Sequence, residues 1–338
     1  MNSDPRFSRR RAIKTLFCSS AVMALNLRGG TALSEVHPTG GLNLLAIGDF
    51  GTGSTDQKSV AQAMQTFVTK NQFTPAAVLM IGDNFYGPVK EGFTADSKRW
   101  KSDIEDMYPA SAFPGPLYPV LGNHDYHDNE GGEKAQLDYA KKPGGRWTLP
   151  SKWYRKDFGG TEPLLTLICL DSNLPAVSGT GKDKKTGKPR RSLTAEEAAV
   201  QLDWLKAELA TPRAAFTLVM GHHPLYSNGD HGDTPALVKE WEPLFQQHQV
   251  HAYLCGHDHD LQHLELEGKF TSHVLSGGGG AKTRKLEQVG RTMPYGNDVH
   301  GFTHIRVQSD GLTFAHHAVD GSLLHRFTKR RDGKVDIG

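Results

Sequence analysis

The chain has 338 residues, a formal net charge of +2 and an isoelectric point near 8.3. A hydrophobic fraction of 37% and a charged fraction of 22% are typical of a globular protein with one large domain or two small ones. So mild a positive charge does not indicate a nucleic-acid partner, and none is expected.

The N-terminus, residues 1–34, has the pattern of an export signal. Ser8–Lys14 contains paired arginines, and an apolar stretch from Thr15 to Leu27 precedes the small residues of Ala32–Ser34. We predict a twin-arginine signal peptide, with the twin-arginine export machinery as a partner and a periplasmic or extracellular destination. An ordinary secretory signal or a disordered basic tail are the alternatives. No later segment offers about 20 apolar residues, so no stable membrane anchor is expected.

Strand-like and helical segments alternate along the rest of the chain. The apolar runs that predict buried strands are Leu42–Ile47, Ala76–Ile81, Leu117–Leu121, Phe216–Met220 and Ala252–Cys255. Helical spacing predicts helices over Asp56–Asn71, Thr194–Leu209 and Pro235–Gln247, and Thr194 with Glu197 has the pattern of a capping box. Shorter strands are predicted at Ser272–Leu275, Thr303–Val307 and Leu312–His317.

Two cysteines, Cys169 and Cys255, follow the predicted signal. Each lies inside or at the end of an apolar run, where a free cysteine behaves as a small buried hydrophobe. A single disulfide is possible in an oxidising compartment, but two cysteines do not form a disulfide scaffold. We predict two free thiols.

Each of the five long apolar runs ends in a glycine and a residue that can bind metal. These pairs are Gly48-Asp49, Gly82-Asp83, Gly122-Asn123, Gly221-His222 and Gly256-His257. Glycine permits a sharp turn and a close backbone approach, and open α/β sheets place their sites at the carboxyl ends of strands. The side chains should therefore converge at one sheet edge.

Seven side chains are candidate metal ligands: Asp49, Asp83, Tyr86, Asn123, His222, His257 and His259. Two carboxylates, a phenol, an amide oxygen and three imidazoles, without a thiolate, suit iron, manganese or zinc. Seven exceed what one ion takes while leaving room for water, so two ions sharing a bridging carboxylate are the economical arrangement. In an extended segment His257 and His259 face the same side, and Asp258 points elsewhere, toward a hydrogen-bond partner.

Taken singly, each of these features has an ordinary explanation. A Gly-Asp pair is a common turn, a His-x-His is more often surface or packing, and Tyr86 alone would anchor its loop. The ordered coincidence of all five pairs at strand ends favours a metal site.

Two glycine-rich segments need separate interpretation. Residues 177–192 are rich in Gly, Lys and Arg, which predicts a mobile exposed loop. This basic loop is either a solvated linker or a cationic flap near an anionic substrate. Gly277–Gly280 is not followed by the Gly-Lys-Ser/Thr of a phosphate-binding loop, so we predict a flexible turn.

The motifs as a set resemble a known superfamily. Gly48–Gly51, Gly82–Tyr86, Gly122–Asp125, Gly221–Pro224 and Gly256–His259 are similar to the five ordered motifs of the metallophosphoesterases, the calcineurin-like superfamily. The tyrosine three residues after Asp83 narrows the resemblance to purple acid phosphatases. The spacing and Gln262 resemble the small, mammalian-type, tartrate-resistant acid phosphatases.

The resemblance implies an α/β fold with a single domain over residues 42–327. This would be a four-layer α/β/β/α sandwich of two mixed sheets flanked by helices, with residues 328–338 as a C-terminal tail. A monomer is expected.

The resemblance also implies roles for the site residues. Asp49, Tyr86 and His259 would hold Fe(III), Asp83 would bridge, and Asn123, His222 and His257 would hold a divalent ion, which is iron, zinc or manganese. His124 and His231 match the two catalytic histidines of the family that do not bind metal, which orient the phosphate and help the leaving alkoxide depart.

The implied activity is that of a secreted acid phosphatase. A metal-bound hydroxide would attack the phosphorus of a small-molecule phosphate monoester, with an acidic pH optimum. A phosphodiesterase or nucleotidase using the same site is one alternative, and a non-catalytic phosphate- or metal-binding protein is another. Peroxidase-like chemistry of an iron pair could coexist. His223 stands where the mammalian-type enzymes commonly have tyrosine, so it either alters leaving-group protonation or substrate choice, or only packs or faces solvent.

Overall fold

The computed structural model describes residues 41–182, 187, 189–287, 291 and 293–338. The predicted signal peptide, residues 1–34, lies outside the described residues. In the part of the chain that is described, none of the helices combines the length and apolar character needed to cross a membrane.

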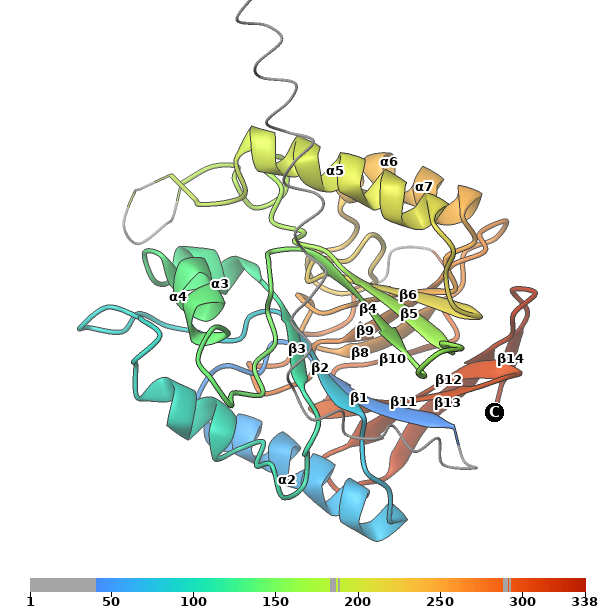
Figure 1. Cartoon of the computed structure of the whole chain (residues 1–338), viewed down its shortest axis with the longest axis horizontal. Coiled ribbons are helices and arrows are strands. Elements are labelled where there is room, and N and C mark those ends of the chain that lie inside the picture. The colour runs from blue at the N-terminus through green and yellow to red at the C-terminus, as the bar shows by residue number, and fades with distance from the viewer. Residues whose placement is uncertain (1–40, 183–186, 188, 288–290, 292) are drawn as a thin grey trace, which may run out of the picture. The chain divides into compact units, whose positions relative to one another are not determined.

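Two mixed sheets of seven strands each pack face to face, with helices on their outer sides (Figure 1). In spatial order, the first sheet contains β14 (Val335–Ile337), β13 (Leu323–Lys329), β12 (Gly311–Ala318), β11 (Gly301–Gln308), β1 (Leu42–Ile47), β2 (Ala77–Ile81) and β3 (Leu117–Val120). The second contains β10 (Tyr295–Asn297), β8 (Leu261–Leu264), β9 (Ser272–Ser276), β7 (Ala252–Cys255), β6 (Phe216–Met220), β5 (Leu165–Cys169) and β4 (Tyr154–Phe158). The predicted sandwich of two mixed sheets is confirmed.

The helices cover the outer face of each sheet (Figure 1). Helix α2 (Thr55–Asn71) lies on the first sheet, and α5 (Ala195–Ala210), α6 (Pro235–Glu240) and α7 (Glu242–Gln247) lie on the second. Three short elements belong to the connections: the π-helical turn η1 (Trp100–Glu105), α3 (Asn123–His127) and α4 (Gly132–Tyr139). The predicted capping box is confirmed, because Thr194 Oγ1 accepts the Glu197 N–H and the Glu197 carboxylate accepts the Thr194 N–H.

One predicted helix is divided in two. Residues Pro235–Gln247 form α6 and α7, which meet at Trp241. Pro243, in the first turn of α7, lacks an N–H, and its ring would clash with the carbonyl four residues earlier in a continuous helix.

Both faces of the central strands are buried, which explains their continuous apolar runs. In β5, Leu167 and Cys169 belong to the core between the sheets. Their neighbours Ile168 and Leu170 belong to a second core, between this sheet and helices α5, α6 and α7. Cys169 and Cys255 are both free and buried, as predicted.

Parallel pairing brings the ends of the ligand-bearing strands to one edge. Strands β1, β2 and β3 are parallel neighbours in the first sheet, and β5, β6, β7 and β9 are parallel neighbours in the second. The Gly48 N–H donates to the carbonyl of Ser276 at 2.8 Å, which ties the end of β1 to the end of β9. The carboxyl ends of strands from both sheets therefore meet.

Two segments differ from expectation. Residues 328–338, expected to be a tail, contain the end of β13 and strand β14, which pair antiparallel. Gly277–Gly280 is not a flexible surface turn, because all four residues are buried. A side chain at Gly279 would overlap the carbonyl of Gly48, so glycine is needed for the close approach of this segment to the β1 loop.

Candidate metal centre

Three of the seven candidate ligands lie in strained loops. Asp49, Asp83 and His257 have φ angles of 57°, 51° and 71°, in the left-handed region that residues with a Cβ rarely adopt. Each is the first or second residue after a strand. Strain of this kind persists where the surrounding structure fixes the conformation, and it is concentrated at functional sites.

The glycines before the ligands allow the loops to approach each other. A Cβ at Gly122 would overlap the carboxylate of Asp83, and a Cβ at Gly256 would overlap that of Asp49. The loop after β3 therefore packs directly on the second aspartate, and the loop after β7 packs on the first.

Asp49, Tyr86 and His259 form one trio of donor atoms. Tyr86 Oη is 3.1 Å from Asp49 Oδ1 and 3.2 Å from His259 Nε2. His259 Nε2 is 3.5 Å from Asp49 Oδ1. Donors about 2.1 Å from one ion and at right angles are about 3 Å apart, so this spacing suits a shared cation.

Asn123, His222 and His257 form a second trio. His222 Nε2 is 3.2 Å from Asn123 Oδ1 and 3.3 Å from His257 Nδ1. The structure thus brings these three donors together from the ends of β3, β6 and β7.

Asp83 lies between the two trios. Its Oδ1 is 3.4 Å from His222 Nε2 and accepts the His124 N–H at 2.9 Å. One donor atom each from Asp49, Asp83 and His222 lies within 4.8 Å of the others. All three side chains are buried.

Hydrogen bonds leave one lone pair of the His222 and His259 imidazoles directed at the cluster. His222 Nδ1 is 2.9 Å from the Ile81 carbonyl, and His259 Nδ1 is 2.8 Å from the Lys282 carbonyl. A carbonyl only accepts, so each Nδ1 carries the proton and each Nε2 is free to bind metal. His257 instead presents Nδ1 to the second trio.

The electrostatics of the cluster favour a bound cation. Burial, together with the charge of nearby Asp83, raises the pKa of Asp49 to about 8. Burial and the neighbouring imidazoles hold the pKa of His257 well below its ordinary value, so its ring stays neutral. Burial and Asp49 raise the pKa of Tyr86, so this phenol would ionise only beside a strong Lewis acid. Although burial lowers it, the charges of Asp83 and Asp49 raise the pKa of His222 to about 10, so these carboxylates attract positive charge to this position. Two buried carboxylates beside the neutral ring of His257 fit positively charged ions.

Two further histidines flank the cluster, each against a carboxylate. His124 Nδ1 is 2.9 Å from Asp128 Oδ2, and its ring lies 4.4 Å from that of Tyr86. His231 Nδ1 is 2.8 Å from Asp258 Oδ1, and its ring lies 4.1 Å from that of His257. The carboxylate of Asp258 therefore points to His231, which is the kind of hydrogen-bond partner expected for it.

Three residues near the cluster were not recognised from the sequence. Asp125 accepts backbone N–H groups from the loops after β2 and β3. Ser172 follows β5 and accepts the N–H groups of His222 and His223. Arg284 Nη1 lies 3.0 Å from His231 Nδ1 and 3.2 Å from His231 Nε2. Only the position of Ser172 after a buried strand was a usable signal.

The basic loop is anchored beside the cluster. Among its described residues, Arg191 donates from Nη2 to the His127 carbonyl at 3.2 Å, and its own carbonyl is 2.9 Å from His127 Nε2. His127 belongs to α3, the helix that begins at Asn123. The end of the loop thus reaches the helix that carries a candidate ligand.

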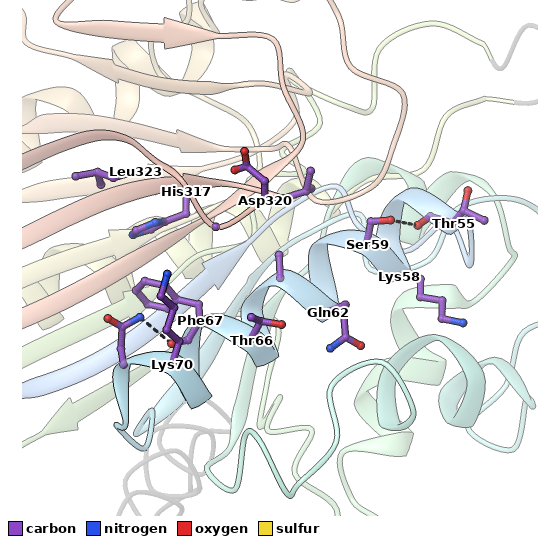
Figure 2. A pocket seen from close by; sticks show the side chains of 14 residues that line it. Thr55, Lys58, Ser59, Gln62, Thr66, Phe67, Lys70, His317, Asp320 and Leu323 are labelled. Carbon is purple, nitrogen blue, oxygen red and sulfur yellow. Dashed lines mark hydrogen bonds between the residues drawn. The ribbon is translucent and has the colours of Figure 1, made fainter.

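A separate groove of about 670 Å³ lies on α2. Figure 2 shows Lys58, Thr66 and Lys70 from α2 on one side of this groove, and Asp320 and Leu323 near the β12–β13 connection on the other. None of the seven candidate ligands lines it, so the candidate chemistry lies elsewhere.

Comparison with known proteins identifies the family. Residues 42–261 match the family model of calcineurin-like phosphoesterases. Tartrate-resistant acid phosphatase type 5 of Mus musculus is 31% identical over 306 residues, which are 86% of this chain and 90% of that protein. Purple acid phosphatase 7 of Arabidopsis thaliana is 29% identical over 299 residues, 85% of each chain.

A solved structure shares the fold. GAP50, described as the anchor in the inner membrane complex of Plasmodium, superposes with a TM-score of 0.71 and 20% identity over 86% of this chain and 88% of that one. An identity this low bears on the fold alone, so the activity is assigned from the acid phosphatase relatives. The chain belongs to the calcineurin-like phosphoesterases and, within them, to the purple acid phosphatases, and it is an acid phosphatase.

Proposed function

We propose that the chain is an exported phosphomonoesterase with an Fe(III) ion and a divalent ion at the strand ends. Asp49, Tyr86 and His259 would hold the ferric ion. Asn123, His222 and His257 would hold the divalent ion, and Asp83 would bridge the two. The observation that carries the proposal is the pair of donor trios with Asp83 between them.

The ions would supply Lewis acidity: they acidify bound water and offset negative charge on the phosphate oxygens. The division of ligands follows from chemistry, because the buried phenol of Tyr86 needs the stronger Lewis acid.

His124 and His231 would manage the leaving group and the phosphate. Although burial lowers it, the charges of Asp83 and Asp128 raise the pKa of His124 to about 9, so this imidazole carries a proton that it can donate. Asp258 accepts from both the backbone N–H and Nδ1 of His231, which fixes the ring of His231. Both histidines then act as positioned donors toward substrate oxygens.

The first test combines metal analysis with a substrate comparison. Purified protein should contain iron and absorb between about 500 and 600 nm through a tyrosinate–iron charge transfer. It should hydrolyse an aryl phosphate faster than a bis-aryl phosphate or ATP. Colourless, iron-free protein would contradict the metal assignment, and a faster rate on the diester would favour the phosphodiesterase alternative.

The second test separates an enzyme from a non-catalytic binding protein. His231→Ala should depress turnover of alkyl phosphates, which have poor leaving groups, more than turnover of 4-nitrophenyl phosphate. His248→Ala, at the C-cap of α7, is a matched histidine control and should leave both rates unchanged. Equal losses on both substrates would argue against a role for His231 at the leaving group.

Export is proposed from the arginine pattern in residues 1–34. Replacement of Arg9, Arg10 and Arg11 by lysine should keep the precursor in the cytoplasm of a bacterial host with a twin-arginine system. Unchanged export of the lysine variant would point to an ordinary secretory signal.

A further inference from the structure

His223 is a buried imidazole beside the candidate metal centre that the proposed mechanism does not use. Its side chain is nearly enclosed, with the residue 4% exposed. Its ring lies 4.4 Å from that of His257 and 5.0 Å from that of His222, both candidate ligands. The solvent-facing alternative considered for this residue is therefore wrong.

The hydrogen bonds of Ser172 determine which ring nitrogen of His223 carries the proton. Ser172 Oγ accepts the N–H of His222 at 3.2 Å and the N–H of His223 at 2.9 Å, which occupies both lone pairs. Its own hydroxyl proton is then directed to His223 Nδ1, at 2.8 Å. An imidazole that accepts at Nδ1 carries its proton on Nε2.

Backbone contacts hold this ring in place. Tyr253 Oη donates to the His223 carbonyl at 2.7 Å, and Tyr253 is fully buried in β7. Ser172 is also fully buried, so Nδ1 faces the interior and Nε2 lies on the opposite side of the ring. Among the described residues no hydrogen-bond acceptor is recorded for Nε2.

The ring of His223 lies beside two members of the second donor trio, His222 and His257. Its ring packs on His257, and His257 in turn packs on His231, one of the two proposed leaving-group residues. A donor at this position, packed on the same metal ligand as His231, would lie where phosphate oxygens approach the divalent ion.

We propose that His223 is a further substrate-binding residue, whose Nε2–H donates a hydrogen bond to a non-leaving oxygen of the bound phosphate. This inference rests on the proposed function. A neutral N–H donor held by packing and by Ser172 needs no reorganisation when an anion binds. A hydrogen bond to a charged group accounts for a 10- to 100-fold effect on affinity, about 1.4–2.7 kcal/mol.

The test compares two substitutions in the metal-loaded enzyme. His223→Phe keeps a ring but removes the donor, whereas His223→Gln places an amide N–H near the position of Nε2. Binding of inorganic phosphate is measured by calorimetry, metal content by elemental analysis, and kcat/KM with aryl monoesters of graded leaving-group pKa.

The proposal requires three results together. His223→Phe should weaken phosphate binding about 10- to 100-fold at full metal content. It should lower kcat/KM by one common factor for all leaving groups, and His223→Gln should recover most of both losses. If His223→Phe loses metal, His223→Leu, which is smaller and also lacks a donor, replaces it in the comparison.

Other outcomes overturn the inference. Phosphate binding within about twofold of the wild type in the apolar variants would show that Nε2 does not contact the anion. A loss that grows with leaving-group pKa would place His223 at the leaving group instead. Wild-type protein that binds phosphate but turns over no monoester would refute the proposed function, while the phosphate titrations would still decide the role of His223.

Discussion

Asp125 should stabilise the loops that carry the candidate ligands without being a ligand itself. Its substitution therefore tests how much these loops depend on hydrogen bonds rather than on metal. Its carboxylate is 3% exposed and accepts three backbone N–H groups. Gly122 N donates to Oδ2 at 2.8 Å, Asn84 N to Oδ2 at 3.2 Å and Phe85 N to Oδ1 at 3.1 Å. One side chain thus joins the loop that carries Asp83 and Tyr86 to the loop that carries Asn123.

Asp125→Ala leaves these donors without an acceptor. An unsatisfied buried group costs about 1–3 kcal/mol, and some of the donors will be rehydrated, so the free energy of unfolding should fall by about 4 kcal/mol. Asp125→Asn can keep its amide oxygen at the Oδ2 position, but its NH₂ then faces the Phe85 N–H. We expect a loss of about 1–2 kcal/mol for this variant.

Urea unfolding of chelator-treated protein, followed by tryptophan fluorescence, measures these losses without the contribution of metal. Asp106→Ala is the control, because that carboxylate is exposed and its ion pair with Lys101 lies at the surface, so its loss should cost less than about 0.5 kcal/mol. An Asp125→Ala midpoint equal to that of the control would refute the reasoning. Reconstituted Asp125→Asn should also bind metal about 10- to 100-fold more weakly.

Three further predictions concern colour, substrate affinity and pH. Tyr86→Phe should abolish the visible absorption band. The apoprotein should keep its melting temperature, because the phenylalanine ring can still pack on His124. A retained band would exclude Tyr86 as the iron ligand. Arg284→Gln should raise the KM for aryl phosphates about 3- to 10-fold with little change in kcat, because the Arg284 guanidinium lies beside His231 and its nearest acidic partner, Asp230, is 3.9 Å away. The control is Lys285→Gln, which removes an exposed charge next to Arg284. Equal KM values in the two variants would contradict this prediction. Burial lowers the pKa of His273 to about 3, so between pH 6.5 and 3 the unfolded state binds a proton that the folded state does not, and stability is lost as pH falls. His273→Leu should remove up to about 1.4 kcal/mol per pH unit of that dependence, measured as melting temperature from pH 7 to 5, and an unchanged slope would contradict it.

The sequence was sufficient to predict the sheet strands and the convergence of the candidate ligands. Strands buried on both faces are continuous apolar runs, and parallel neighbours must present their carboxyl ends at one edge. Once Asp49, Asp83 and His222 each follow such a run, their proximity depends on strand order within each sheet and on the face-to-face packing of the two sheets. This explains why residues far apart in sequence could be grouped before the structure was known.

The supporting residues could not be predicted because their roles depend on contacts between loops. Ser172 follows an apolar run, but its role depends on the backbone N–H groups of His222 and His223, about 50 residues later. Asp125 was noted as part of a motif, but its acceptor role depends on the loop after β2. Gly277–Gly280 resembles a loose turn in composition, yet its lack of side chains serves close packing against the β1 loop.

The candidate ligands are divided between the two sheets, since Asp49, Asp83 and Asn123 follow strands of the first, and His222 and His257 follow strands of the second. Ions held by both groups would link the two sheets, and above the dissociation constant their binding would add to the free energy of unfolding in proportion to the logarithm of the free metal concentration. If these ions bind as proposed, the supply of metal would govern how long the polypeptide survives proteases as well as how fast it works. A starved cell would accumulate less enzyme before any catalytic defect became visible.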